Sequence, residues 1–376
     1  MKPGALFISN EIYFDLSAKE GGVRVCTEEY LHLLRQLYDV KVLTVRYDIS
    51  LGYRLRVKLG LNIYNDYCPE KYIDNLRDII KKYNIRIVFL NLSNTAPFAV
   101  VIKTAFGDQV KVVLCSHGNE SGDFLHAATR FKKNVPAYRR WLSGYTLGHM
   151  LKKEAQFRQL YLDAVLTVSP VEEALERWLG AKQVLMVPRM VNPQFISRNP
   201  LVGRVGFIGD LSHAPNFYGI DEVCKAISSL PQQSAINMRL VGAPASIGEA
   251  LARQYSFITY LGYMGNEELE AEAGSWTYFL NPVFYYSRGV STKLAKAFGW
   301  GVPVITTTIG CRGYQWENGD PLYAETPSAM AEAIAKYSMA PALFLKANAE
   351  IQTLVSSMPD MGMNASILAA FLRGII

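Results

Sequence analysis

Short runs of apolar residues alternate with helical patterns along the chain, and this alternation predicts a parallel sheet in the first half. Runs typical of buried strands lie at 5–9, 41–45, 85–91, 111–116, 164–168 and 184–187. Segments with apolar residues at helical spacing lie between them, at 25–37, 73–82 and 97–106, and the region 130–180 also has helical character. Because strands buried on both faces and separated by helices are typical of βαβ units, we expect a doubly wound domain.

The second half repeats this organisation after a polar, proline-punctuated break. Strands are predicted at 204–208, 237–241, 258–261, 277–281 and 303–306. Helices are predicted at 218–229, 244–254, 266–273, 292–300 and 328–337. We therefore expect an α/β protein with two Rossmann-like domains, at 1–188 and 196–357, joined by a linker at 189–195. A C-terminal helix at about 358–376 is expected to pack back on the first domain.

Composition narrows the class of protein. A length of 376 residues suits two domains, and a hydrophobic share of 50% with 19% charged residues excludes a disordered chain. A membrane-spanning helix needs about 20 apolar residues, and the chain has no run of that length. The first residues also lack the apolar stretch of a secretory signal. Five scattered cysteines predict buried or half-buried thiols in a reducing cytoplasm.

The charge is concentrated in the first half, where residues 1–180 carry a net +6 while the remainder is neutral. The stretch 130–158 has one acid, Glu154, and eight basic residues: Arg130, Lys132, Lys133, Arg139, Arg140, Lys152, Lys153 and Arg158. Trp141 and several tyrosines are interleaved with them, which favours peripheral contact with an anionic membrane. The alternatives are a solvated helix face and cations around an acceptor phosphate. Nucleic acid is not expected, because no recognisable binding motif is present.

The densest group of candidate residues lies at 287–314. Arg288 and Gly289 precede a predicted helix that Ser291 or Thr292 can cap, and Lys293 lies in its first turn. A cation at a helix N-terminus is unfavourable by about 0.3–1 kcal/mol unless an anion binds there. A diphosphate would supply that anion. A capped helix with two solvated cations is the alternative.

This segment resembles the donor-binding segment of glycosyltransferases with the GT-B fold, above all the large retaining family numbered four, or group 1. The pattern Gly-x-x-Thr-Lys-Leu-x-x-Ala-x-x-x-Gly-x-Pro-Val-Ile-Thr runs from Gly289 to Thr306. The stretches 166–175, 187–195, 205–223, 239–243 and 258–269 resemble other parts of the family in order and spacing. The resemblance implies the GT-B fold, with two doubly wound domains that face a central cleft.

The resemblance also implies a function. A sugar would move from a nucleotide-sugar donor to a glycan or lipid-linked acceptor, with retention of configuration, in the assembly of bacterial cell-surface polysaccharide such as O-antigen, capsule or lipopolysaccharide. The donor-binding residues would be Gly21, Gly22, Gly209, Asn216, Gly242, Tyr263, Met264, Arg288, Gly289, Ser291, Thr292, Lys293 and Lys296. The catalytic residues would be His117, Arg288 and Lys293, and Arg24 and Glu120 would bind the acceptor.

The chain departs from the family at two positions of the donor helix. Many relatives have two glutamates eight residues apart, where this chain has Arg288 and Lys296. Arg288 matches a subgroup with an Arg-Gly loop, so we keep it as a phosphate or sugar ligand. Lys296 either donates to a nucleotide oxygen or points to solvent. His213 is a further candidate at the border of the donor site.

Each first-domain candidate has a structural alternative. Gly21 and Gly22 permit close approach of a ligand, or simply a flexible loop. His117 follows a buried strand and is either a sugar ligand or a structural histidine. Glu120 is either an acceptor ligand or a solvated carboxylate.

No resident cofactor and no metal are expected, because the chain contains no Asp-x-Asp pair, Walker loop or dinucleotide fingerprint. Two other functions stay open. One is a sugar-nucleotide epimerase on the same fold. The other is a non-catalytic nucleotide-sugar-binding subunit, suggested by the missing glutamates.

Overall fold

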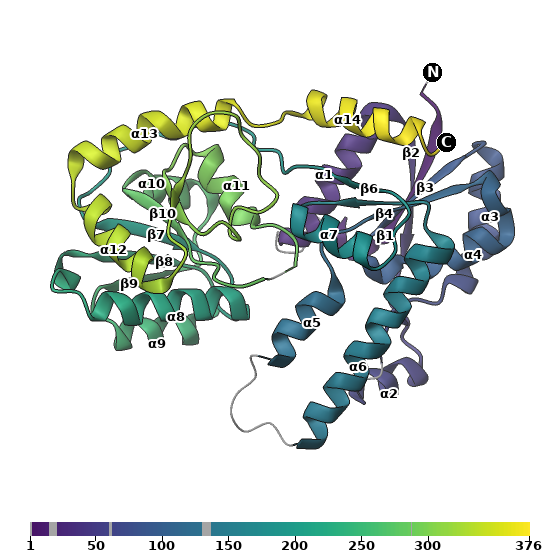
Figure 1. The fold of residues 1–376 in the computed structure, drawn as a ribbon, viewed down its shortest axis with the longest axis horizontal. Helices are drawn as coiled ribbons and strands as arrows, with labels where there is room; N and C mark the ends of the chain where they lie inside the picture. The colour runs from purple at the N-terminus through teal and green to yellow at the C-terminus, as the bar shows by residue number, and fades with distance from the viewer. Residues whose placement is uncertain (1, 15–20, 60–61, 130–136, 287) are drawn as a thin grey trace. The chain divides into compact units, whose positions relative to one another are not determined.

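The chain forms two units, each built on its own parallel sheet. The computed structural model describes residues 2–14, 21–59, 62–129, 137–286 and 288–376 (Figure 1). The first unit contains residues 1–188, 287–290 and 361–376, and the second contains 189–286 and 291–360. The segment 189–195 therefore belongs to the second unit by its contacts, and the loop 287–290 belongs to the first.

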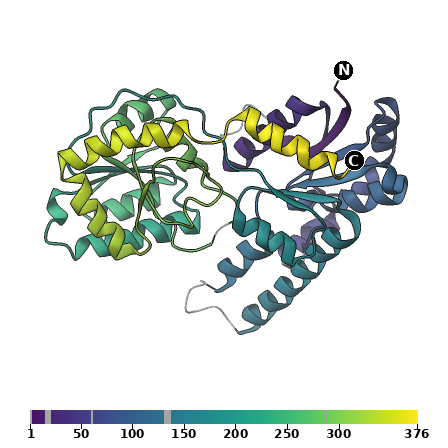
Figure 2. The same cartoon turned by 45° about the horizontal axis from the view of Figure 1, so that its top comes forward.

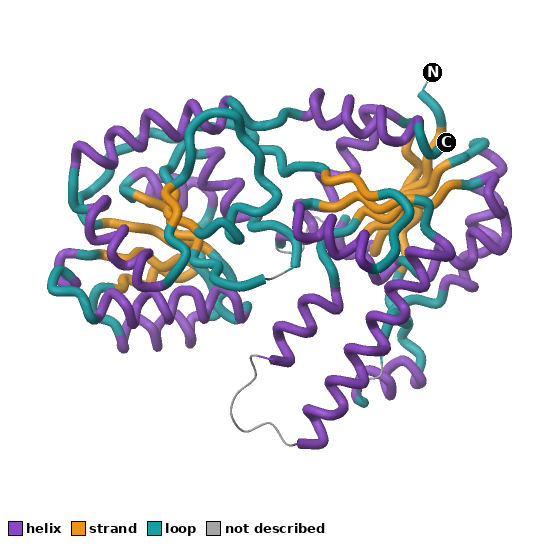
Figure 3. The backbone as a smooth tube through the Cα atoms, in the orientation of Figure 1, coloured by secondary structure: helices purple, strands orange, loops and turns teal. Residues whose placement is uncertain are grey.

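The sheet of the first unit has six parallel strands in the order β2-β1-β3-β4-β5-β6. Figure 3 shows the strands of both units in orange. They are β1 (Gly4–Asn10), β2 (Asp39–Val45), β3 (Ile87–Asn91), β4 (Lys111–Cys115), β5 (Ala164–Thr167) and β6 (Val184–Met186). The central strand β3 is buried at every position, as its run of apolar residues predicts. The strand order reverses between β1 and β3, so the loops after these two strands diverge and leave room for a ligand.

Helices cover this sheet on both faces, a doubly wound arrangement that two views show (Figures 1 and 2). The helices of this unit are α1 (Gly22–Leu37), α2 (Leu51–Lys58), α3 (Ile73–Lys82), α4 (Pro97–Phe106), α5 (Glu120–Thr129), α6 (Ala137–Gln156), α7 (Pro170–Trp178) and α14 (Met361–Arg373), and not all of them lie on the sheet. The C-terminal helix α14 packs on α1, where Leu368 and Leu372 are buried in the core of this unit. The helix α7 begins with a proline after the cap Ser169, whose hydroxyl accepts from the Glu172 amide at 3.2 Å.

The second unit has the strand order β12-β11-β10-β7-β8-β9, which reverses between β7 and β10. Its strands are β7 (Arg204–Ile208), β8 (Asn237–Val241), β9 (Ile258–Gly262), β10 (Tyr278–Asn281), β11 (Val304–Thr306) and β12 (Leu322–Tyr323). Its helices are α8 (Ala214–Ser228), α9 (Ala245–Gln254), α10 (Asn266–Gly274), α11 (Thr292–Gly299), α12 (Pro327–Ser338) and α13 (Pro341–Ser356).

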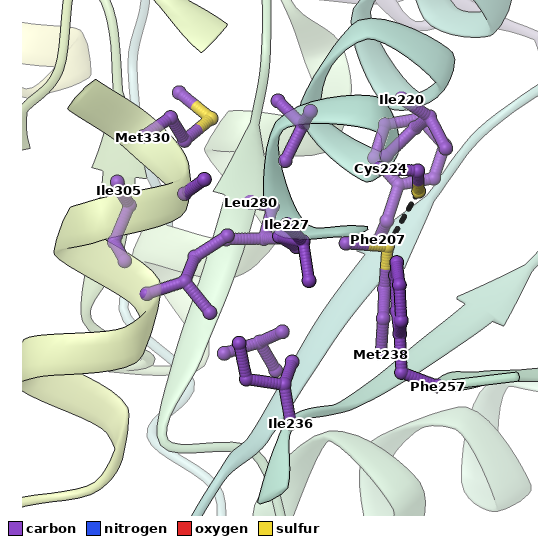
Figure 4. Close-up of a cluster of buried hydrophobic side chains, with 14 of the residues drawn as sticks. Phe207, Ile220, Cys224, Ile227, Ile236, Met238, Phe257, Leu280, Ile305 and Met330 are labelled. Atoms are coloured by element: carbon purple, nitrogen blue, oxygen red, sulfur yellow. Dashed lines mark hydrogen bonds between the residues drawn. The ribbon is translucent and has the colours of Figure 1, made fainter. Parts of the chain in front are cut away.

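One buried cluster of the second unit lies between the sheet and helices α8 and α12, and a second contains residues of α10, α11 and α13. Figure 4 shows side chains of the first cluster, among them Phe207, Ile220 and Met330, and all three are fully buried. The Cys224 sulfur lies 3.8 Å from that of Met238 in this cluster. Cys26, Cys115, Cys224 and Cys311 are buried and Cys68 is half-buried, which confirms the expected burial of the cysteines.

Several elements differ from the sequence-based expectation. Helix α8 begins at Ala214 rather than 218, because Pro215 is suited to the first turn of a helix. Helices α2, α5 and α13 and the two-residue strand β12 were not predicted. In α2 the apolar residues point to solvent rather than to the core.

Candidate functional site

In the second unit, the candidate donor residues meet where the strand order reverses. Asn216 lies in the first turn of α8, which follows β7, and Lys293 lies in the first turn of α11, which follows β10. The Lys293 ammonium donates to the Asn216 side-chain oxygen and lies 4.5 Å from the centre of the Phe207 ring. Open α/β sheets bind ligands at this position.

Lys293 has an unusual electrostatic environment. Within the described residues, no carboxylate lies close enough to form an ion pair with the Lys293 ammonium. The ammonium contacts the side-chain amide of Asn216 and the ring of Phe207 instead. Burial lowers the pKa of the Lys293 amine to about 7. A bound anion would favour the protonated form again and would pair with it.

Two predicted glycines lie beside this pair and have a packing role. Gly242 has a φ of 150° and its α-carbon faces the Gly209 carbonyl so closely that any side chain would clash. Gly209 lies close to the Asn216 amide and to the Phe207 ring. The loops after β7 and β8 can therefore approach each other only with glycine at position 242.

The predicted capping at the start of α11 is wrong in its detail. Ser291 is the N-cap residue, but its hydroxyl donates to the Asn281 side-chain oxygen at 3.2 Å and makes no cap hydrogen bond. The Ser291 carbonyl accepts from the Tyr314 hydroxyl at 2.6 Å. Thr292 is the first residue of the helix. The first turn of α11 thus has no side-chain cap, and its backbone amides remain suited to an anion.

The other second-unit candidates lie at the surface. Lys296 donates to the Asn266 side-chain oxygen at 3.1 Å and lies 5.3 Å from the Trp300 ring. Tyr263 is 74% exposed after β9, and Met264 packs partly against the core. His213 is the N-cap residue of α8 and makes no side-chain cap bond.

In the first unit, a pocket of about 370 Å³ opens at the carboxyl ends of the strands. Tyr13 follows β1, Tyr47 follows β2, Asn94 follows β3 and Glu120 begins α5 after β4. The complete lining is Tyr13, Val23, Tyr47, Tyr53, Asn62, Ile63, Tyr64, Asp66, Leu92, Asn94, Glu120, Met150 and Arg288. Aromatic rings and carboxylates in one pocket can stack on a sugar ring and bind its hydroxyls.

The carboxylates of this pocket are affected by burial. Burial raises the pKa of Asp66, and the hydrogen bond that the Asn62 amide donates at 2.6 Å opposes that change. Burial also raises the pKa of Glu120, while the adjacent Arg288 guanidinium lowers it. Arg288 pairs with Glu120 and lies 3.7 Å from an Asp123 oxygen. The guanidinium of Arg288 is thus held by acidic residues of the first unit, and its role as a phosphate or sugar ligand stays a prediction.

The loop 288–290 is held by a buried glutamate that the sequence did not reveal. One Glu172 oxygen accepts from the Gly289 amide at 3.2 Å, and the other accepts from the Asn119 amide at 2.9 Å. Glu172 is fully buried. Gly118 packs so closely on Arg288 and Gly289 that a side chain at position 118 would clash. Both oxygens of Glu172 thus act as acceptors for backbone amides, and this fixes Arg288 beside the pocket.

His117 is buried rather than exposed at the end of β4. Its Nε2 lies 2.8 Å from the side-chain oxygen of Asn91, whose amide nitrogen donates to Ser9 at 2.8 Å and to Thr27 at 2.9 Å. The Thr27 hydroxyl donates to the Val23 carbonyl at 2.9 Å and therefore accepts from the Asn91 nitrogen. The Asn91 oxygen then faces His117, and this arrangement assigns Nε2 as the donor. A direct contact of His117 with the sugar stays a prediction.

The glycine loop and Arg24 lie at the start of α1. Gly21 is the N-cap residue of α1 and Gly22 is its first residue, and among the described residues no atom lies within 4 Å of where a β-carbon at position 21 would be. Arg24 pairs with Glu28 one turn along the same helix at 2.9 Å. Residues 15–20, just before this loop, lie outside the described residues.

The basic stretch 130–158 is divided by the structure. Arg158 is fully buried and binds Glu176 through two hydrogen bonds of 2.5 and 2.7 Å, so its assignment to a surface stripe is wrong. Lys153 donates to the Ile63 carbonyl at 2.8 Å, whereas Lys152 is exposed. The remaining cations, and the side chain of Trp141, lie outside what the structure describes: Arg130, Lys132, Lys133, Arg139 and Arg140.

Sequence reasoning missed most of the pocket lining. Tyr13, Tyr53 and Asp66 lie in loops or on short helices without a motif, and Glu172, which holds the loop 288–290, was also missed. A signal for Glu172 was present, since a Ser-Pro-x-Glu start places a glutamate in the first turn of α7. No helix in the described part of the chain has the length and apolarity that crossing a membrane requires.

One family model matches part of the second unit. Residues 203–338 match the family model described as “Glycosyl transferases group 1”. No curated protein sequence matches this chain.

Solved structures are similar over the whole chain. Sucrose-phosphate synthase from Thermosynechococcus elongatus has a TM-score of 0.67 at 18% identity, with 99% of each chain covered. HepE from Anabaena, in complex with UDP-glucose, has a TM-score of 0.65 at 12% identity, with 99% of each chain covered. The lipopolysaccharide outer core galactosyltransferase WaaB has 0.64 at 12%, covering 99% of this chain and 100% of that one. The chain has the GT-B fold, and the expected resemblance is confirmed.

Proposed function

We propose that this chain, which carries a group 1 glycosyltransferase domain on a GT-B fold, transfers a sugar from a nucleotide-sugar donor to a glycan or lipid-linked acceptor. The observation that carries the proposal is Lys293, a half-buried amine with a lowered pKa and no carboxylate partner within the described residues. It lies at the strand-order reversal of the second unit, within the matched domain.

A diphosphate suits the surroundings of Lys293. The uncapped first turn of α11 offers backbone amides, and Lys293 offers a positive charge with one neutral partner. Negative charge grows on the diphosphate as the bond to the sugar breaks. A fixed ammonium and aligned amides stabilise that charge, which is the largest contribution such a site makes to catalysis.

The pocket of the first unit is proposed as the acceptor site. Its four tyrosines offer flat apolar faces, while Asp66, Glu120 and two asparagines offer acceptors and donors for sugar hydroxyls. Arg288, held against Glu120, keeps that carboxylate oriented toward the pocket lining. The assignment of Glu120 to acceptor binding is part of this proposal.

Several finer features also belong to the proposal. Retention of configuration, independence of metal ions and a place in bacterial cell-surface polysaccharide assembly are inferred from the family resemblance and from the sequence. Reversible peripheral contact with an anionic membrane through 130–158 also stays part of the proposal. Arg158 is buried and is excluded from the residues that would make this contact. WaaB, a lipopolysaccharide galactosyltransferase by its description, supports an acceptor of the lipid-linked class.

The experiment that tests the proposal is incubation of the full chain with labelled UDP-, GDP-, dTDP- and CMP-sugars and a crude lipid-glycan extract. We expect transfer of label from one of the four donors to the extract. Isomerisation of the sugar nucleotide without transfer would show an epimerase instead. Binding seen as a thermal shift, without transfer or isomerisation, would show a non-catalytic subunit.

A further inference from the structure

Helix α2 carries its apolar residues on the outside. Leu51, Leu55 and Leu59 follow one another at a spacing of four residues along α2 and its C-cap, and they are 83%, 59% and 53% exposed. This spacing places the three side chains on one face of the helix. Ile49, just before the helix, is 78% exposed. A helix of a globular domain normally turns such a stripe toward the core.

The inner face of α2 is attached to the unit through polar groups. The Ser50 hydroxyl caps the helix by accepting from the Tyr53 amide at 3.1 Å, and it donates to Asp48 at 2.7 Å. Tyr53 lines the pocket, and Arg56 is half-buried with its guanidinium 3.9 Å from Asp48. The cap and these contacts fix the orientation of the helix, so the exposed leucines are not the result of a frayed end.

The charge around the leucine stripe has one sign. Residues 49–59 contain Arg54, Arg56 and Lys58 and no acid. Arg54 and Lys58 are exposed beside the stripe, and neither forms an ion pair in the part of the chain that the structure describes. Figure 1 shows α2 at the end of the first unit that is remote from both chain termini.

We infer that α2 docks the first unit on an anionic lipid bilayer, with Leu51, Leu55 and Leu59 inserted and Arg54 and Lys58 at the headgroups. An apolar stripe bordered by cations is the pattern of an interfacial helix. A second copy of this chain is a poorer occupant, because a symmetric contact between two α2 faces would bring like charges together. The eight-residue helix offers little area, so docking is reversible.

This surface differs from the stretch 130–158 and has a consequence for the acceptor. Tyr53 lies on the same helix and lines the proposed acceptor pocket. Docking through α2 therefore brings the mouth of that pocket near the lipid surface, where a lipid-linked sugar is found. Only this last step depends on the proposed function.

The test is flotation of the full chain with vesicles of neutral phosphatidylcholine or of phosphatidylcholine with phosphatidylglycerol. One variant combines Leu51→Gln, Leu55→Gln and Leu59→Gln, and a second combines Arg54→Gln and Lys58→Gln. The matched control is Leu345→Gln with Lys346→Gln on α13, where the leucine is 57% exposed and the lysine side chain 72%.

We expect the wild type and the control to float with anionic vesicles at low salt. The leucine variant should bind at least about tenfold more weakly at every salt concentration, because the inserted area is lost. The charge variant should bind about tenfold more weakly on anionic vesicles and be unchanged on neutral ones. Thermal unfolding and sugar-nucleotide binding of both variants should match the wild type, because the changed residues are exposed.

Three results would overturn the inference. The wild type could fail to bind anionic vesicles, or the leucine variant could bind as well as the wild type. A wild-type dimer in light scattering that the leucine variant dissolves would show that a second copy covers the stripe. None of these measurements needs a donor or an acceptor, so a failure of docking and a failure of the glycosyltransferase proposal are separate results.

Discussion

The two units place opposite chemistry at equivalent positions of similar sheets. At the strand-order reversal of the second unit, Lys293 lies against an amide and a phenyl ring, without a carboxylate in the described residues. Near the reversal of the first unit, Glu120 and Asp66 line a tyrosine-rich pocket, and the Arg288 guanidinium there is already paired. Under the proposed function, the first of these positions would bind an anion and the second a ligand rich in hydroxyl groups.

The difference shows which part of the molecule sets the chemistry. Both sheets are parallel and doubly wound, and in each the candidate residues follow the ends of strands. The fold therefore provides two similar places for ligands, while the loops decide what each place binds. The electrostatic contrast predicts that changes in one unit affect mainly the donor and changes in the other mainly the acceptor.

The largest effect is expected for Lys293→Ala. Loss of a charge-assisted contact costs about 1.5–3 kcal/mol, so sugar-nucleotide affinity should fall about 10- to 100-fold. The matched control is Lys296→Ala, one turn along α11, where the ammonium binds Asn266 at the surface. Titration calorimetry with the donor measures both. Equal affinity of Lys293→Ala and wild type would remove the anion site from the second unit.

A smaller effect is expected for Glu172→Gln, which tests how the first unit holds Arg288. Both oxygens of the Glu172 carboxylate accept hydrogen bonds from backbone N–H groups. In glutamine one of these oxygens is replaced by an NH₂ group, which cannot accept, so one of the two backbone N–H groups would lose its partner. This costs about 1–3 kcal/mol of stability. Misplacement of Arg288 should also slow transfer about tenfold and leave the donor KM nearly unchanged.

The control for that change is Glu173→Gln, at the neighbouring position, where the side chain is 31% exposed and pairs with Arg177. Thermal unfolding and steady-state kinetics compare the two variants. If Glu172→Gln unfolds and turns over like Glu173→Gln, the two backbone hydrogen bonds do not position the loop.

The sequence predicted the fold better than the site. The strands 204–208 and 237–241 and the helix 73–82 have the predicted bounds, because buried strands and amphipathic helices leave strong periodic patterns. Helix α2 was not predicted although its leucines recur every four residues, because the helix has only eight residues and so carries a short pattern. Its leucines face solvent and its inner face is polar, so the rule that an apolar stripe marks the buried face would also have assigned the wrong side.

The site depends on contacts between residues far apart in the chain. The motif around Lys293 was visible in the sequence because it lies within a single strand-loop-helix segment. Its partner Asn216 lies 77 residues away, and Arg288 meets Glu120 across a still longer separation. The sequence indicated that Arg288 was a cation but not that acidic residues already neutralise it.

Asp66→Asn should weaken acceptor binding without lowering the free energy of unfolding. The change keeps an acceptor for the Asn62 amide but removes the charge, so the acceptor KM should rise a few-fold and donor affinity should not change. Burial raises the pKa of Asp66 above its value in the unfolded chain. Between these two pKa values the folded protein binds more protons than the unfolded chain, so the free energy of unfolding falls as the pH rises through this window.

The variant lacks that loss and should therefore be slightly more stable than wild type at neutral pH. Asp78→Asn, an exposed position on α3, is the control for both measurements. A variant with normal acceptor kinetics would remove Asp66 from the acceptor site.

Donor binding should take up protons above neutral pH. In the free protein burial lowers the pKa of Lys293 to about 7, and a bound diphosphate restores the proton. At pH 8 calorimetry in two buffers of different ionisation enthalpy should show uptake of close to one proton, and at pH 6 almost none. In Lys293→Arg the guanidinium stays protonated, so uptake should vanish.

The free protein gives an independent check of the same pKa. Between pH 7 and the ordinary lysine value of about 10.4, the unfolded chain binds more protons than the folded chain. The free energy of unfolding should therefore rise with pH across this window through Lys293, and the rise should be absent in Lys293→Ala. Equal slopes in both proteins would contradict the lowered pKa.

The smallest effect is expected from the removal of divalent metal ions by chelation. This experiment tests whether Lys293 binds the donor diphosphate without the help of a metal ion. A divalent ion at a diphosphate is held by carboxylates, and the sequence has no Asp-x-Asp pair to supply them. Lys293 and the amides at the start of α11 would provide the positive charge instead. Donor affinity and transfer should then be the same after exhaustive treatment with EDTA, and added Mg²⁺ or Mn²⁺ should not rescue Lys293→Ala. Activity that EDTA abolishes and Mn²⁺ restores would show that the anion site of the second unit is completed by a metal, and the contrast between the two units would then rest on that ion rather than on Lys293.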